Sequence, residues 1–245
     1  MNFFKKLITL SSALILSANL LAQDLLMGTT TSLDDTGFLT EVAKEFKAES
    51  GIELKWISKG TGEAMELGKR GDVDLLFVHD PGREEQFIKD GYGKARHSFM
   101  YNYFVLVAAK DFNLNGFPKD VNEVMKKIAQ DNIIFISRGD NSGTHSKEKA
   151  LWKAAGIEPK FKNYKESGTG MAKTLNMTSE LNGITLSDNG TFYSVEKNFG
   201  LKEVPLNPSE VLRNTYSILE LKDTTPEKQK AIDELVKFLE SPKGQ

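Results

Sequence analysis

The segment DLLMGTTTSLDDTGFL, residues 24–39, places four consecutive hydroxyl residues between an apolar run and an amphipathic stretch. The apolar run and the β-branched threonines favour a strand. Apolar residues then recur at helical spacing up to Phe46, which predicts a helix from about Asp35 to Ser50. Thr29 to Ser32 therefore form a tight turn between a strand and a helix. Hydroxyls and unpaired backbone N–H groups in such a turn are donors suited to an anion.

The same order of strand and helix recurs along the chain. Apolar strand patterns at GIELKWIS, VDLLFVHDP, IIFISRG and GITLSD are each followed by a helical pattern. This alternation predicts an α/β fold in which mainly parallel sheets are flanked by helices.

Two long extended segments, about Met100 to Ala108 and Asn214 to Leu221, bracket the middle of the chain. We interpret them as strands that cross between two lobes. The first expected lobe comprises residues 23–105 together with 218–245, and the second comprises residues 106–217.

Residues 1–22 have the layout of a secretory signal peptide. Lys5 and Lys6 precede an apolar stretch from Leu7 to about Leu16, and small residues lead to Ala22. The apolar stretch is short for a membrane span, so we expect cleavage after Ala22. No cysteine follows the apolar stretch to carry a lipid anchor. A soluble, exported protein of the periplasm is expected.

Composition narrows the class of partner. The formal net charge is −2 at pH 7 and no basic run occurs, which argues against nucleic acid. The chain has no cysteine and only three scattered histidines, so we expect no disulfide, no bound metal cation and no cofactor. A monomer is expected.

Four turns combine glycine with serine or threonine at predicted helix starts. They are GTTTS (28–32), KGTGEA (59–64), SRGDNSGTH (137–145) and SGTGMA (167–172). The first N–H groups of a helix are unpaired, its dipole favours negative charge, and glycine lets a ligand approach the backbone. Each turn alone is also explained by an N-cap that stabilises a helix by roughly 1 kcal/mol. Four such turns at strand ends predict one shared anion.

Arg138 supplies a positive charge within the third turn. It lies between an apolar strand and a predicted helix start, and Asp140 follows two residues later. We interpret Asp140 as the residue that orients the guanidinium. The alternative is a local surface ion pair worth about 0–1 kcal/mol.

Five segments, in the order TTTS…DTGFL, GTGEAM, SRGDNSGTH, GTGMAKTL and TLSDNGTFY, carry a resemblance. With them the chain resembles the periplasmic tungstate-binding proteins of ABC importers, over nearly all of its length after the leader. TTTS is the most specific of these motifs. Lys59 and Thr169 depart from the family pattern, and the family continues into a further helix where this chain ends, which suggests a shortened chain.

The resemblance implies a two-lobed type II periplasmic-binding-protein fold that closes on one tetrahedral oxyanion, with tungstate expected first. It also implies delivery to an ABC permease at the inner membrane. The ligand contacts that it implies are Thr31, Ser32, Thr61, Arg138, Ser142, Gly143, Thr144, Thr169 and Gly170.

Two alternatives stay open. Molybdate, phosphate or sulfate can occupy the same fold. Because tungstate and molybdate carry no proton at neutral pH, their ideal site contains donors only, and we read Asp34 and Asp35 as residues that complement a helix dipole. The second alternative is a hydrolase built on Ser142, His145 and Asp140, although no G-x-S-x-G elbow accompanies them.

Overall fold

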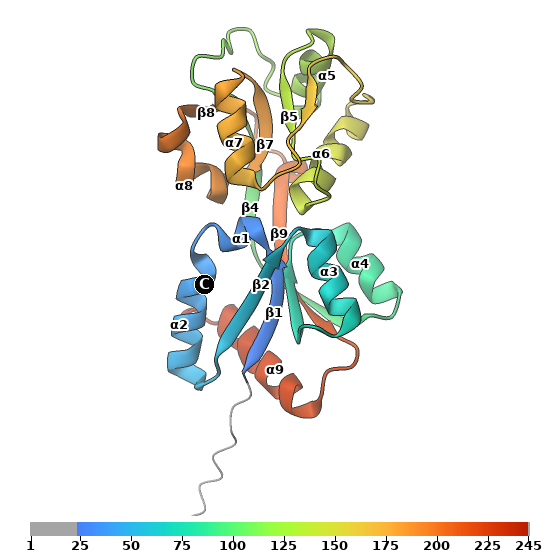
Figure 1. Cartoon of the computed structure of the whole chain (residues 1–245), viewed down its shortest axis with the longest axis vertical. Coiled ribbons are helices and arrows are strands. Elements are labelled where there is room, and N and C mark those ends of the chain that lie inside the picture. The colour runs from blue at the N-terminus through green and yellow to red at the C-terminus, as the bar shows by residue number, and fades with distance from the viewer. Residues whose placement is uncertain (1–23, 245) are drawn as a thin grey trace, which may run out of the picture.

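The computed structural model describes residues 24–244, so the proposed signal peptide lies outside the described part. Two lobes of strands and helices stand end to end, joined by two long strands (Figure 1). The strands are β1 (Leu25–Thr30), β2 (Leu54–Lys59), β3 (Leu75–Val78), β4 (Gly93–Ala109), β5 (Phe135–Ser137), β6 (Tyr164–Glu166), β7 (Ile184–Asp188), β8 (Leu201–Glu203) and β9 (Arg213–Leu221). The helices are α1 (Thr31–Asp34), α2 (Phe38–Ser50), α3 (Thr61–Arg70), α4 (Pro81–Lys89), α5 (Val121–Gln130), α6 (Gly143–Ala154), α7 (Met171–Glu180), α8 (Asn189–Phe199) and α9 (Pro226–Glu240), with a 3-10 turn η1 (Glu210–Leu212).

Each lobe contains one mixed sheet. In the first lobe the strand order is β2-β1-β3-β9-β4, where β1 is parallel to β2 and β3, and β9 is antiparallel to both of its neighbours. In the second lobe the order is β4-β7-β5-β6, where β5 is parallel to β6 and β7, and β8 pairs with β4. The α/β prediction is confirmed, although antiparallel strands at the junction make both sheets mixed.

Strand β4 belongs to both sheets. It pairs with β9 as far as Tyr103↔Arg213, and from Phe104↔Asp188 it pairs with β7 instead. The exposure of β4 follows this exchange, because the stretch from Phe104 to Ala109 is buried and the stretch before it is largely accessible. Since β9 pairs with β4 along its whole length, the first-lobe sheet includes 213–217. The lobe limits expected from the sequence remain a prediction.

Helices cover both faces of each sheet, as Figure 1 shows. Strand β3 reads as apolar throughout, and all four of its residues are at most 1% exposed, as expected for a strand buried on two faces. In the first lobe α2 and α9 pack on one face, where the Phe46 and Phe238 rings lie 5.6 Å apart. In the second lobe the Trp152 ring of α6 meets Phe135 of β5 at 5.0 Å.

Two predicted elements differ from the structure. The helix expected from Asp35 begins at Phe38 instead, after Gly37 with its left-handed φ of 75°, and a separate short helix, α1, precedes it. The pattern KEVPLN, residues 202–207, predicts a strand, but β8 covers only Leu201–Glu203, since Pro205 lacks the N–H that a ladder needs. A further strand, β6, was not predicted, because three residues carry too short a pattern.

Candidate functional site

The four glycine and hydroxyl turns lie at the carboxyl ends of four strands. In the first lobe the turns join β1 to α1 and β2 to α3, and in the second they join β5 to α6 and β6 to α7. The strands of each pair are parallel, so their turns share one edge of the sheet. The lobes touch at these edges, where Arg83 Nη1 donates to Asn141 O at 2.7 Å and Thr191 Oγ1 donates to Ser32 O at 3.4 Å.

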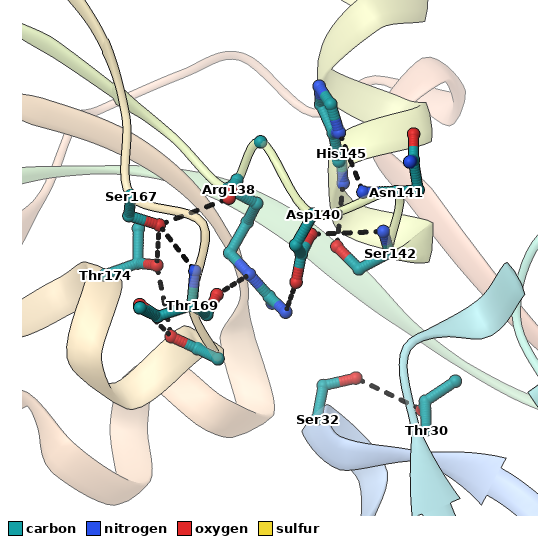
Figure 2. Close-up of polar contacts among 12 residues, drawn as sticks. Thr30, Ser32, Arg138, Asp140, Asn141, Ser142, His145, Ser167, Thr169 and Thr174 are labelled. Atoms are coloured by element: carbon teal, nitrogen blue, oxygen red, sulfur yellow. Dashed lines mark hydrogen bonds and ion pairs between the residues drawn. The ribbon is translucent and has the colours of Figure 1, made fainter. Parts of the chain in front are cut away.

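Arg138 is held on two sides while one of its nitrogens has no partner. Its side chain is 2% exposed. Nε donates to Thr169 O at 2.8 Å, and Nη2 pairs with Asp140 Oδ2 at 2.5 Å (Figure 2). Nη1 is buried and makes no hydrogen bond to any described residue. The prediction that Asp140 orients the guanidinium is confirmed, and Nη1 is a buried charged donor without a partner among the described residues.

The fourth turn holds Arg138 through its backbone. Thr169 O accepts the Nε–H, and Ser167 Oγ lies 3.3 Å from Arg138 O and 2.8 Å from Thr174 Oγ1. Thr169 is half-buried and Gly170, the N-cap of α7, is exposed. The structure therefore brings Thr169 to Arg138 as a carbonyl acceptor.

The start of α6 combines capping with close approach. Ser142 Oγ accepts from His145 N at 3.2 Å, and Ser142 N donates to Asp140 Oδ1 at 3.1 Å. The hydroxyl of Ser142 is thus the N-cap of α6, as the plainer interpretation of this turn has it. Thr144 lies in the first turn of the helix and is 1% exposed.

Gly143 brings α6 against the first lobe. A Cβ at this position would lie 2.8 Å from His79 Cε1 and 3.1 Å from Thr61 Oγ1. Thr61 begins α3 and is fully buried, and its hydroxyl has no hydrogen-bond partner within the described part of the chain. The starts of α3 and α6 therefore meet around a second unpaired donor.

The GTTTS turn divides its hydroxyls between two tasks. Thr29 Oγ1 donates to Phe77 O at 2.9 Å and so belongs to the sheet. Ser32 is 4% exposed, and its Oγ lies 3.3 Å from Thr30 Oγ1 and 3.3 Å from His79 Nε2. Thr31 begins α1 and is half-buried. Figure 2 shows Thr30 and Ser32 across from the Arg138–Ser142 segment of the other lobe.

Two carboxylates near these turns have their oxygens engaged. Asp34 accepts from Trp56 Nε1 at 2.8 Å and from Ser58 Oγ at 2.6 Å, which ties α1 to β2. Asp140 binds Arg138 and Ser142 N. The reading of Asp34 as a helix-dipole residue alone was therefore incomplete. For Asp35, burial and the neighbouring Asp34 carboxylate raise the pKa.

Sequence reasoning missed a chain of buried polar residues beside the site. His79 Nδ1 lies 2.9 Å from Asn214 Oδ1, and Asn214 Nδ2 donates to Asn102 Oδ1 at 2.7 Å. Asn102 Nδ2 donates to Asp188 Oδ1 at 3.2 Å, and Asp188 Oδ2 is buried with no partner among the described residues. The available signal was position, because His79 ends the VDLLFVHDP strand pattern where a turn begins.

The comparisons with known proteins show the family of this chain. A family model described as a PBP superfamily domain matches residues 17–242. The tungstate-binding protein TupA of Peptoclostridium acidaminophilum is 39% identical over 198 residues, which cover 80% of this chain and 69% of that protein. The chain belongs to the tungstate-binding-protein family of the PBP superfamily.

Two solved structures of this family share the fold over most of both chains. The tungstate ABC transporter protein of Geobacter sulfurreducens has a TM-score of 0.79 and 36% identity, covering 91% of this chain and 95% of that one. The tungstate-binding protein TupA of Desulfovibrio alaskensis G20 has a TM-score of 0.76 and 38% identity, covering 91% and 92%. The type II periplasmic-binding-protein fold expected from the sequence is confirmed.

The alternative of a hydrolase built on Ser142, His145 and Asp140 is wrong. Proteins of this family are binding proteins, and this chain is not an enzyme. The hydrogen bonds agree, since His145 Nδ1 accepts from Asn141 N while Ser142 Oγ accepts from the His145 backbone. Asp140 is engaged by Arg138 and not by the imidazole.

Within 24–244, no group of three or more His, Cys, Asp or Glu side chains is placed to hold a metal ion. No helix in the same range has the length and apolar character needed to cross a membrane.

Proposed function

We propose that this protein captures tungstate between its two lobes in the periplasm and delivers it to the permease of an ABC importer. The observation that carries the proposal is a pair of buried donors, Arg138 Nη1 and Thr61 Oγ1, that have no partner within residues 24–244. An unsatisfied buried donor costs about 1–3 kcal/mol, and an oxyanion between the lobes satisfies both. The proposed contacts are Thr31, Ser32, Thr61, Arg138, Ser142, Gly143, Thr144, Thr169 and Gly170.

The chemistry of the donors supports a dianion without protons. Arg138 provides the charge, and Thr61 together with the starts of α3 and α6 provides neutral donors. The carboxylates of Asp34 and Asp140 are engaged by neighbouring groups. Tungstate needs donors alone, and three relatives at 38–39% identity are tungstate-binding proteins.

Hydrogen phosphate is the second candidate, and one observation favours it. Asp188 Oδ2 is a buried acceptor without a partner in the described range. A protonated oxyanion donates to such an oxygen, whereas tungstate does not. Asp188→Asn therefore separates the two candidates, because it weakens hydrogen phosphate binding and leaves tungstate binding in place.

Titration calorimetry of the mature protein with sodium tungstate, molybdate, sulfate and phosphate tests the proposal. We expect one tungstate per chain and weaker or no binding of sulfate and phosphate. Tight binding also raises the melting temperature, because it adds about 4 kcal/mol to the free energy of unfolding when ligand is at a thousandfold excess over Kd. Absence of heat and of stabilisation with both tungstate and molybdate contradicts the proposal.

Closure of the lobes is measured separately. If ligand draws them together, small-angle scattering gives a smaller radius of gyration with tungstate than without it. An unchanged radius contradicts closure on binding.

A further inference from the structure

His79 lies behind the first-lobe hydroxyls and contacts both the site and the crossing strands. It is 4% exposed, with Nε2 3.3 Å from Ser32 Oγ and Nδ1 2.9 Å from Asn214 Oδ1 of β9. Its ring stacks near Tyr216 with centroids 4.9 Å apart. Both ring nitrogens therefore face a defined partner, and the site uses only one of these partners.

The direction of each hydrogen bond along this chain is set from its far end. Asp188 Oδ1 accepts from Thr191 N at 2.9 Å and from Asn102 Nδ2 at 3.2 Å. With its amide nitrogen so used, Asn102 presents its oxygen to Asn214 Nδ2 at 2.7 Å. Asn214 in turn presents its oxygen to His79 Nδ1, which must carry a proton to donate.

Proton placement on Nδ1 fixes the behaviour of Nε2. In the neutral ring Nε2 is an acceptor, and it then accepts a hydrogen bond from the Ser32 hydroxyl. In the protonated ring Nε2 is a donor to Ser32 Oγ, and the hydroxyl proton is free to point elsewhere. The Ser32 hydroxyl has one proton, so while it donates to His79 it cannot donate to a ligand.

We propose that His79 is a positioning residue whose protonation turns the Ser32 hydroxyl from the imidazole toward the oxyanion, so that binding takes up a proton at Nε2. The inference rests on the proposed function. It adds proton linkage and a pH-dependent affinity to that function. The N–H bond at Nε2 is the only covalent bond formed in the protein, and its proton comes from solvent.

The charges around His79 agree in sign with this linkage. Burial lowers the pKa of His79 in the free protein, Asp188, Asp80 and the Asn214 bond oppose that shift, and Arg138 adds to it. His79 is thus neutral at neutral pH before binding. A bound dianion favours the imidazolium and raises its pKa. Affinity then falls as pH rises through the window between the two pKa values, by at most tenfold per pH unit.

Calorimetry with sodium tungstate in buffers of different ionisation enthalpy counts the protons taken up, from about pH 5.5 to about pH 8.5. We expect uptake of up to one proton per tungstate within the window for the wild-type protein. His79→Gln keeps a polar side chain but removes the titration, and Ser32→Ala removes the hydroxyl; both are expected to lose most of the uptake. His97→Gln is the matched control. His97 lies on the N-terminal part of β4 and pairs with Glu220 of β9, so its loss is expected to leave the uptake unchanged.

Nitrogen NMR of wild-type His79 gives a measurement that needs no variant. We expect the Nδ1–H tautomer in the free protein and the doubly protonated ring in the tungstate complex. Tight binding without proton uptake, or uptake that survives His79→Gln or Ser32→Ala, overturns the inference while the proposed function stands. No tungstate binding at all overturns the proposed function instead.

Discussion

The two sides of the contact between the lobes are built differently. On the second-lobe side a buried guanidinium is clamped by Asp140 and Thr169 O, and among the described residues Nη1 has no partner. On the first-lobe side the donors are neutral hydroxyls, and that of Ser32 has His79 as an alternative hydrogen-bond partner. The guanidinium side is therefore fixed before a ligand binds, whereas the Ser32 hydroxyl can change its hydrogen-bond partner.

This difference indicates a division of labour. A clamped charge attracts any oxyanion and costs little reorganisation on binding. Neutral hydroxyls add little long-range attraction, but their hydrogen bonds are directional and depend on the size and shape of the ligand. The charged side is expected to govern affinity, and the hydroxyl side is expected to govern which anion is preferred.

The largest effect is expected at the charged side. Arg138→Ala removes the guanidinium and leaves Asp140 without its partner, so we expect at least a hundredfold loss of tungstate affinity, or about 3 kcal/mol or more. Arg138→Lys restores the charge without the two-pronged geometry and recovers the affinity only in part. Calorimetry measures both variants, and parental affinity in Arg138→Ala would show that the charged side is not the anchor.

Thr61→Val tests the hydroxyl side with nearly constant shape. It removes an unpaired buried donor, so the free protein is expected to become equally or more stable. The complex loses a hydrogen bond to a charged group, about 1.5–3 kcal/mol, or roughly tenfold to a hundredfold in Kd. A variant whose free form is at least as stable as the parent in thermal unfolding, but which binds tungstate more weakly in calorimetry, identifies Thr61 as a ligand contact. A variant that loses stability and keeps its affinity places Thr61 in the fold alone.

Gly143→Ala tests how closely the two sides must approach. The added methyl would lie 2.8 Å from His79 Cε1, which belongs to the other lobe. Overpacking of about 1–2 kcal/mol is expected in the closed form, or roughly fivefold to thirtyfold in Kd. Gly82→Ala, where a methyl has ordinary contact distances, is the control and should keep the parental affinity in the same titration. Equal affinities of the two variants would contradict contact between the sides in the complex.

The smallest effect on binding is expected at Thr29, next to the site in sequence. Its hydroxyl donates to Phe77 O inside the sheet, so Thr29→Val should cost about 1 kcal/mol of stability and leave the Kd within about twofold. Denaturant unfolding together with calorimetry checks both values. Thr31→Val is the companion variant, expected to weaken binding by about tenfold or more. A larger loss of affinity in Thr29→Val than in Thr31→Val would show that the ligand contacts the end of β1 and not the start of α1.

Much of the fold was predictable because its signals are local. Strand β3 is apolar throughout and the four turns carry glycine beside hydroxyls, so periodicity and turn chemistry placed them correctly. The exchange of β4 between two sheets at Phe104 was less accessible, since β4 reads as one unbroken extended segment. Which strand pairs with which half is decided by packing of residues far apart in the sequence.

The site was predictable to a similar depth. Arg138 and Asp140 are two residues apart, so their pairing follows from spacing. His79 follows β3, whereas Asn214 and Asp188 lie on β9 and β7, and nothing in the sequence near one of them points to the others. The engagement of Asp34 by Trp56 and Ser58 also depends on pairing between elements. Contacts of this kind require the fold.

The position of β9 has a consequence for biosynthesis. This strand lies between β3 and β4 in the middle of the first-lobe sheet, yet it is formed by the end of the chain, and α9 follows it. A nascent chain has all the strands of the second-lobe sheet by Glu203 but cannot complete the first sheet until Leu221 has been added. The first-lobe sheet therefore depends on residues that follow the whole second lobe in the sequence, whereas the second-lobe sheet does not.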